Sequence, residues 1–143
     1  MKPVRTLVVA GLLVVLIGAG CASDDGSEPS AGNDLAVPPA MADPAAFASR
    51  IAAPGVVTVN VHTPNEGSIA GTDLTIAFDE IAESSELPDD LGTPLAVYCR
   101  SGNMSAAAVD DLEALGYTDI VELDGGFNAW KASGRPLEPS ATD

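Results

Sequence analysis

Short apolar runs alternate with segments of helical periodicity between residues 42 and 137, and this alternation strongly constrains the fold. Runs rich in β-branched and aliphatic residues occupy 56–61, 95–98 and 120–123, and helical patterns lie between and after them. Strands that are joined by helices pair in parallel, because a parallel pair needs a long crossover connection. The sequence therefore predicts an α/β domain with a small, mostly parallel β-sheet that is flanked by helices on both faces.

Capping residues mark the ends of the predicted helices. Asp43 is followed by a proline, and the two supply an N-cap and a first turn for a short helix through Arg50. Asp79 is expected to cap a second short helix near residues 80–84. Gly116 follows the last apolar position of a longer helix and provides its C-terminal stop.

Cys99 stands at the end of the predicted central strand, and a short loop of sequence CRSGNMS leads from it into an alanine-rich helical pattern. A helix that begins near Asn103 or Met104 presents free N–H groups and the positive end of its dipole to this loop. A thiolate there is both stabilised and exposed to substrate. The alternative is a structural cysteine in the core. Arg100 and Gly102, which follow it, argue against a deep core position.

Three segments of the chain resemble the rhodanese-domain sulfurtransferases. The loop from Cys99 is similar to the active-site loop of that family, in which a cysteine and a short loop lead into a helix. Residues 60–71 are similar to the first family signature, with Asn60 and His62 where the family more often has Asp and Arg. Residues 124–131 are similar to the second signature, a glycine turn that leads into a terminal helix. The resemblance implies the rhodanese-like fold.

The resemblance also implies roles for the loop residues. Cys99 corresponds to the nucleophile that becomes a persulfide. The backbone amides after it correspond to the cradle that holds the outer sulfur or the donor anion, and they belong to Arg100, Ser101, Gly102, Asn103, Met104 and Ser105. The sulfur donor would be thiosulfate or a persulfide, and the acceptor a thiol or cyanide. Neither a metal nor an organic cofactor is implied.

Loop length and charge bear on the type of reaction. Phosphatases related to the rhodaneses have a loop one residue longer that ends in Arg, whereas the loop here is the shorter form, and Met104 stands where many family loops carry Arg. Phosphoryl transfer needs cationic groups, so a phosphate or arsenate ester enzyme is disfavoured. Arg100 is the one side-chain cation left in the loop for thiosulfate, a dianion.

The alternative function of a different class is a non-catalytic rhodanese-fold module for sulfur delivery or redox sensing.

Other chemistry-bearing residues are expected to have structural roles. His62 is the only histidine of the chain, so it supports neither a metal site nor a catalytic triad. We expect it to pack or to hydrogen bond at a strand end. Trp130 is expected to be a core aromatic of the last helix.

The first twenty residues follow the plan of a secretory signal. Lys2 and Arg5 form a basic start, residues 6–17 are uncharged and mostly aliphatic, and small residues precede Cys21. A cysteine directly after small residues resembles a bacterial lipoprotein signal, in which the cysteine is lipidated and becomes the mature N-terminus. The alternative is an uncleaved signal anchor, because the apolar run has about the shortest length that spans a bilayer. Either arrangement tethers the domain to the extracytoplasmic face of the cell membrane.

The predicted organisation is a lipoprotein signal peptide at 1–20, a flexible linker at 21–40 and one rhodanese-like domain at 41–139. The linker is rich in Ser, Asp, Gly and Pro and has little to bury. The formal net charge of the chain is −15, and every acidic residue follows residue 20. A surface this acidic disfavours nucleic acid and anionic lipid headgroups as partners.

The chain has two cysteines, which in an exported protein would ordinarily suggest a disulfide. If Cys21 carries lipid, however, Cys99 keeps a free thiol. A free thiol is a liability in an oxidising compartment unless it is used. The disulfide alternative would leave no nucleophile.

Overall fold

The computed structural model describes residues 40–140 of the chain. The predicted signal peptide, nearly all of the predicted linker and the predicted lipidation site Cys21 lie outside the described residues. Between residues 40 and 140, no helix is long and apolar enough to cross a membrane.

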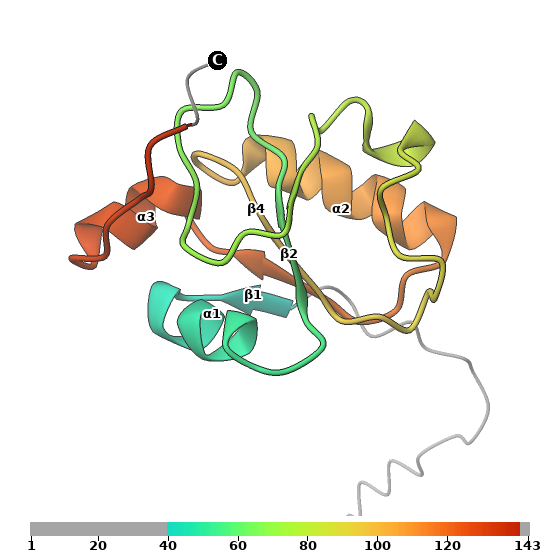
Figure 1. Cartoon of the computed structure of the whole chain (residues 1–143), viewed down its shortest axis with the longest axis horizontal. Helices are drawn as coiled ribbons and strands as arrows, with labels where there is room; N and C mark the ends of the chain where they lie inside the picture. The colour runs from blue at the N-terminus through green and yellow to red at the C-terminus, as the bar shows by residue number, and fades with distance from the viewer. Residues whose placement is uncertain (1–39, 141–143) are drawn as a thin grey trace, which may run out of the picture. The chain divides into compact units, whose positions relative to one another are not determined.

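Five strands form one sheet in the order β1-β5-β4-β2-β3, and all neighbouring strands are parallel. The strands are β1 (Ala40–Ala42), β2 (Val57–Asn60), β3 (Leu74–Thr75), β4 (Leu95–Tyr98) and β5 (Ile120–Leu123). The helices are α1 (Pro44–Ile51), α2 (Asn103–Leu115) and α3 (Gly126–Ala132), with a 3-10 helix η1 (Ile81–Glu83) (Figure 1). The predicted α/β fold with a parallel sheet is confirmed.

Local chemistry explains most element ends. The Asp43 carboxylate accepts hydrogen bonds from the backbone N–H groups of Ala45 and Ala46, both at 2.8 Å, so the predicted N-cap of α1 is confirmed. Gly116 ends α2 in the left-handed conformation, also as predicted. The prediction for Asp79 was wrong, because η1 begins after Glu80 and has no side-chain cap.

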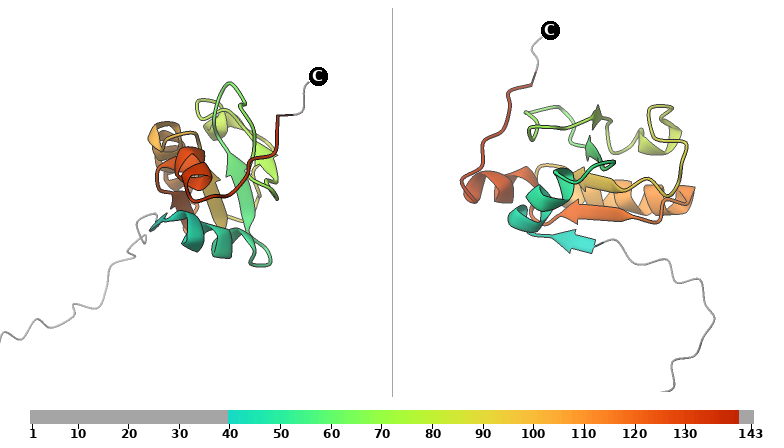
Figure 2. Two further views of the ribbon diagram at one scale, coloured as in Figure 1. Left: turned by 90° about the vertical axis from the view of Figure 1, so that its left-hand side faces the viewer. Right: turned by 60° about the horizontal axis from the view of Figure 1, so that its bottom comes forward.

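Two short strands at the edges of the sheet were not predicted. Strand β1 begins at Ala40, the last residue of the predicted linker, and pairs only with β5 (Figure 2, right). Strand β3 pairs only with β2. Both are too short to show an alternating pattern, so only the pairing with a neighbouring strand defines them.

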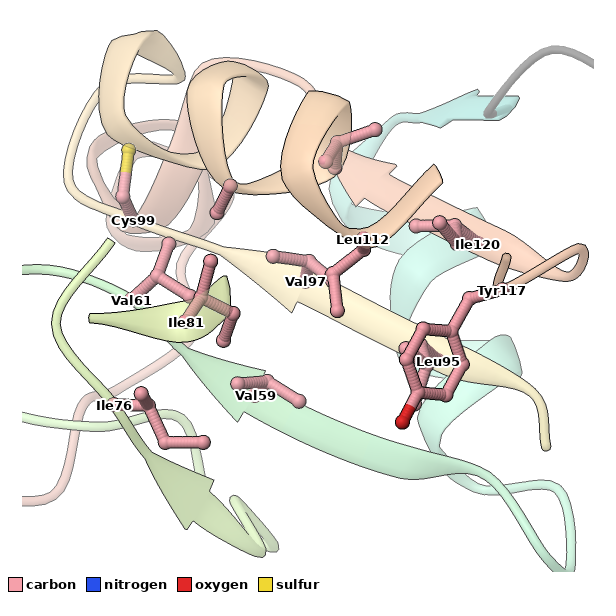
Figure 3. Close-up of a cluster of buried hydrophobic side chains, with 12 residues drawn as sticks. Val59, Val61, Ile76, Ile81, Leu95, Val97, Cys99, Leu112, Tyr117 and Ile120 are labelled. Carbon is pink, nitrogen blue, oxygen red and sulfur yellow. The ribbon is translucent and has the colours of Figure 1, made fainter. Parts of the chain in front are cut away.

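The sheet separates two apolar layers, since successive side chains of a strand point to opposite faces. One layer lies under α2 and η1 and includes Val97 of β4 and Leu112 of α2 (Figure 3). The other lies under α1 and α3 and includes Tyr98 and Trp130, which confirms the core position predicted for this tryptophan. Strand β4 is buried along its whole length, as expected for a central strand.

Candidate active site

Cys99 follows β4 directly and lies at the carboxyl edge of the sheet, where parallel α/β folds bind ligands. Its side chain closes the end of the apolar layer under α2, beside the beginning of that helix (Figure 3). The exposed fraction of Cys99 is 0%, so the thiol is more buried than a residue exposed to substrate was expected to be. The reason is that β4 directs Cys99 to the same face as Val97, and the loop covers the sulfur. Cys99 nevertheless lines an open pocket of about 460 Å³, which places the thiol at the pocket floor.

Backbone amides of the loop converge on the Cys99 sulfur. The Gly102 N–H donates to Sγ at 3.1 Å, and the N–H groups of Ser101 and Ser105 also lower the pKa of the thiol. Gly102 has a φ of +105° and is the N-cap residue of α2 without any side-chain cap, so the first N–H groups of the helix remain available to the thiol. Of the six amides of the predicted cradle, the Gly102 amide hydrogen bonds to Sγ, and those of Ser101 and Ser105 also favour the thiolate.

Helix α3 holds the carbonyl groups of the same loop. The Phe127 N–H donates to the Cys99 carbonyl at 2.9 Å, and the Asn128 N–H donates to the Arg100 carbonyl at 3.1 Å. A Cβ atom at Gly126, whose φ is +57°, would lie 2.4 Å from the Cys99 carbonyl oxygen, so only glycine fits there. Because α3 takes up these carbonyls, the following N–H groups of the loop are left to face Sγ.

Hydrogen bonds favour the thiolate form of Cys99. Burial raises the pKa of the thiol, but the Ser105 hydroxyl and the backbone N–H groups of residues 105, 101 and 102 outweigh it. The net result is a Cys99 pKa below its ordinary value. A lowered pKa increases the thiolate fraction near neutral pH, and the thiolate is the nucleophilic form.

Glu122 is a site residue that the sequence reasoning missed. It lies on β5, is only 5% exposed, and accepts a hydrogen bond from the Ser105 hydroxyl at 2.6 Å. The Ser105 Oγ is in turn 3.3 Å from Cys99 Sγ. The available signal was the position of an acidic residue two places after Ile120, on the strand face that packs under α2.

The Arg100 side chain points away from the sulfur. It is 54% exposed and forms an ion pair with Glu66, at 3.3 Å between Nη1 and Oε1. The other oxygen of Glu66 lies 3.4 Å from His62 Nε2, although the geometry falls short of a hydrogen bond. The only cationic side chain of the loop is thus already next to a carboxylate.

Five further side chains line the rest of the pocket. Ser101, Asn103 and Met104 line it together with His62 and Asn128. Met104 Sδ lies 3.4 Å from His62 Nδ1. His62 is buried at the end of β2 and packs edge-on against Phe127, which agrees with the packing role expected for it.

The fold and the cysteine loop agree with a comparison to known families. The model of the rhodanese-like domain family matches residues 43–133. The chain belongs to the rhodanese-like domain family. The sequence resemblance stated above is therefore confirmed at the level of the family.

Relatives and solved structures extend this comparison. The thiosulfate sulfurtransferase GlpE of Pseudomonas fluorescens is 32% identical over 89 residues, which cover 55% of this chain and 73% of that protein. An uncharacterized protein of Synechocystis sp. is 34% identical over 84 residues, and the chain spans only 46% of its length. The crystal structure of a rhodanese-related protein from Thermoplasma volcanium matches with a TM-score of 0.58 and 33% identity, over 68% of this chain and 96% of that one.

Among residues 40–140, no cluster of three or more His, Cys, Asp or Glu side chains could hold a metal ion. The chemical groups that the site offers are therefore a buried thiol, converging amides, a serine hydroxyl and a carboxyl group.

Proposed function

We propose that this rhodanese-like domain is a sulfurtransferase that carries sulfane sulfur as a persulfide on Cys99. The observation that supports this best is the pair of hydrogen bonds from the Gly102 N–H and the Ser105 hydroxyl to the Cys99 sulfur, at the floor of a pocket. Such a cradle stabilises a thiolate before the reaction and an anionic outer sulfur after it. The relative named as a thiosulfate sulfurtransferase supports the same reaction class.

The reaction would proceed in two half-reactions. In the first, the Cys99 thiolate attacks the outer sulfur of the donor, a new S–S bond forms, and the old bond breaks. With thiosulfate as donor, sulfite leaves with the electron pair of the broken bond. In the second, an acceptor thiolate or cyanide attacks the outer sulfur of the persulfide, and Cys99 leaves as a thiolate. No step needs a metal or an organic cofactor.

The pocket favours a persulfide donor over thiosulfate. Thiosulfate carries two negative charges, and the net charge of the whole chain is −15. Arg100 is paired with Glu66, and Met104 contributes no charge. The binding of a dianion would rest on the amides of the cradle and the positive end of α2. A thiol persulfide carries less charge and meets less repulsion.

The test is direct detection of the persulfide. The full chain is incubated with thiosulfate or with a low-molecular-weight thiol persulfide, and the mass of the Cys99 peptide is measured before and after cyanide. We expect one added sulfur, its removal by cyanide, and release of thiocyanate. Cys99→Ser should fold normally and abolish all three signals, because a hydroxyl without an adjacent base is a poor nucleophile. Transfer by Cys99→Ser at the parental rate would disprove the role of Cys99.

The second candidate is a non-catalytic module for sulfur delivery or redox sensing. The observation that favours it is the complete burial of the Cys99 side chain. In that case the Cys99 peptide gains no sulfur from either small donor. A persulfide that forms but is not released to cyanide would indicate delivery to a protein acceptor instead.

We also propose that the domain is tethered by lipid on Cys21 at the extracytoplasmic face of the cell membrane. The support is the arrangement of basic residues, an aliphatic run and small residues before Cys21. The native protein should partition with membranes, and Cys21→Ala should block both lipid labelling and signal cleavage. Release of unlipidated native protein without detergent would contradict this proposal.

A further inference from the structure

The Ser105 hydroxyl has one proton and three acceptors within reach. They are the Glu122 carboxyl oxygen at 2.6 Å, the Gly102 carbonyl at 3.0 Å and the Cys99 sulfur at 3.3 Å. A hydroxyl donates only one strong hydrogen bond at a time. An ionised Glu122 is the nearest acceptor and the charged one, so the Ser105 hydroxyl donates its hydrogen bond to Glu122. The lone pairs of Ser105 Oγ then face Cys99.

Glu122 lies in surroundings that favour its neutral form. Burial raises the pKa of this carboxyl, the hydrogen bond from Ser105 opposes the rise, and the negative charges of Asp124 and Asp110 add to it. Its neighbour on β4 is Val97, and none of the ion pairs within residues 40–140 includes Glu122. A buried carboxyl without a cationic partner can hold a proton near neutral pH.

A protonated Glu122 reverses the direction of the hydrogen bonds. Its O–H group donates to Ser105 Oγ, and the Ser105 hydroxyl then donates to Cys99 Sγ. The neutral carboxyl is therefore matched to the thiolate of Cys99, whereas the ionised carboxyl is matched to the thiol. A single negative charge can lie on either Glu122 or Cys99, and Ser105 then hydrogen bonds to it. If both groups are ionised, the one hydroxyl proton of Ser105 can serve only one of them at a time.

We propose that Glu122 takes up the proton of the Cys99 thiol through Ser105 and so prepares the buried thiolate for reaction. The S–H bond breaks, its proton goes to Ser105 Oγ, the Ser105 proton goes to Glu122 Oε1, and the electron pair stays on Sγ. Glu122 acts here as a positioning residue, since it reaches the sulfur only through Ser105. The importance of this step for sulfur transfer rests on the proposed function.

The surroundings of Cys99 favour proton transfer within the site. The Cys99 side chain has no exposed surface, and Ser105 Oγ, 3.3 Å from Sγ, is already in place to receive its proton. The paired Arg100 contributes little free positive charge to the thiolate. Transfer to Glu122 moves one charge within the site and adds none to an acidic protein.

The experiment is the pH dependence of alkylation of Cys99 by iodoacetamide in the full chain, measured on the Cys99 peptide by mass spectrometry. The parent should show two steps, because Glu122 and Cys99 lose their protons as a coupled pair. In Glu122→Gln the side-chain amide can donate to Ser105 as the protonated carboxyl does. We expect a single step whose midpoint lies about one pH unit below the upper step of the parent. At a pH below that midpoint, alkylation of Cys99 should be about tenfold faster than in the parent.

Two variants separate this route from simple charge repulsion. Asp110→Asn removes a nearby charge on α2 that has no hydrogen bond to Ser105, and it should keep both steps with a smaller shift. Ser105→Ala should raise the midpoint for Cys99 and remove the lower step. In the Ser105→Ala background, Glu122→Gln should have little further effect. Equal shifts from Glu122→Gln with and without Ser105, or no shift at all, would overturn the proposal.

Measurements on Ser105→Ala alone keep the proposal testable if Glu122→Gln fails to fold, since retention of both steps without the hydroxyl would also overturn it. Alkylation requires no sulfur donor. A parent chain that shows the two-step profile but gains no persulfide would therefore disprove the proposed function and leave the proton transfer intact. If the chain forms the persulfide but shows one alkylation step that is unchanged in Glu122→Gln, the proton transfer is disproved and the proposed function stands.

Discussion

The two faces of the sheet bury different kinds of side chain. The face under α1 and α3 is filled by aromatic rings, with Phe47 in edge-to-face contact with both Tyr98 and Trp130 at centroid distances of 6.2 and 6.3 Å. The face under α2 is mainly aliphatic, with Tyr117 at its far end, and it also buries Ser105 and Glu122 near Cys99. Both faces bury polar groups, but Asn60 on the aromatic face donates to the Gly67 carbonyl, whereas Ser105 on the α2 face contacts the Cys99 sulfur.

The Tyr98 hydroxyl on the aromatic face has a structural use. The Tyr98 hydroxyl accepts a hydrogen bond from the Ile69 N–H at 2.9 Å and lies 2.7 Å from the Thr72 hydroxyl, so it ties the loop after β2 to β4. On the α2 face, the polar groups contact the nucleophile instead. Reactivity and stability can therefore be changed separately, except where the two faces meet at the loop.

The largest loss of stability is expected from Phe47→Ala on the aromatic face. Phe47 is fully buried, so its truncation should lower the free energy of unfolding by about 3 to 5 kcal/mol. Denaturant unfolding measures this, and Phe47→Leu, which leaves a smaller cavity, should cost less. The folded fraction should retain the parental pH profile of Cys99 alkylation. A large change in that profile would show that the two faces are not separable.

Gly126→Ala tests the place where the faces meet. The added Cβ would contact the Cys99 carbonyl oxygen, and relief of that contact should cost about 1 to 3 kcal/mol and displace the amides around Sγ. Gly134→Ala is the matched control, because Gly134 also has a positive φ but a Cβ there meets no atom within 4 Å. Gly126→Ala should slow Cys99 alkylation at neutral pH, whereas the control should affect stability alone. Equal alkylation rates would contradict the role of α3 in aligning the loop.

Met104→Arg adds a cation to the pocket on the α2 face. It should speed the thiosulfate half-reaction by several-fold to tens-fold, since about 1.4 kcal/mol corresponds to one decade. Stopped-flow or quenched measurements of persulfide formation check this, with a thiol persulfide as the comparison donor. If thiosulfate kinetics stay unchanged while the thiol persulfide reacts well in both forms, transfer between thiols is the better description of the activity.

Glu66→Gln is expected to have a smaller effect in the same direction. It releases Arg100 from its carboxylate partner, and both side chains are substantially exposed, so thiosulfate reactivity should rise only a few-fold. The gain should shrink as salt screens the charges. Glu80→Gln removes an equal charge from an exposed residue outside the Cys99 pocket and serves as the control. A similar gain from both variants would assign the effect to net charge rather than to Arg100.

Much of the fold could be predicted because its signals are local. The apolar run at Leu95–Tyr98 became β4, and the cap at Asp43 began α1 as expected. The edge strand β1 could not be predicted from its three residues, because its pairing with β5 is a contact across most of the domain. The cap at Asp79 failed because the segment forms only one 3-10 turn, which Glu80 precedes.

The site was predictable where its parts are consecutive in the chain. The amides of Gly102 and Ser105 are held by the same loop that carries Cys99, so a single segment reveals them. Glu122 reaches Ser105 from another strand, and Glu66 reaches Arg100 from a loop. Such partners depend on the spatial order of the strands, which no local pattern contains. The full burial of Cys99 has the same origin.

The close approach of α3 to the cysteine loop also has a consequence for the order in which the protein is assembled. Strand β4 and Cys99 leave the ribosome well before the N–H groups of Phe127 and Asn128, which hold the loop carbonyls. Until those later residues have been synthesised and α3 has docked against the loop, the loop lacks the two hydrogen bonds that turn its amides toward sulfur. A nascent or unfolded chain therefore has an ordinary thiol at Cys99, and the activated cysteine arises only when the domain is complete.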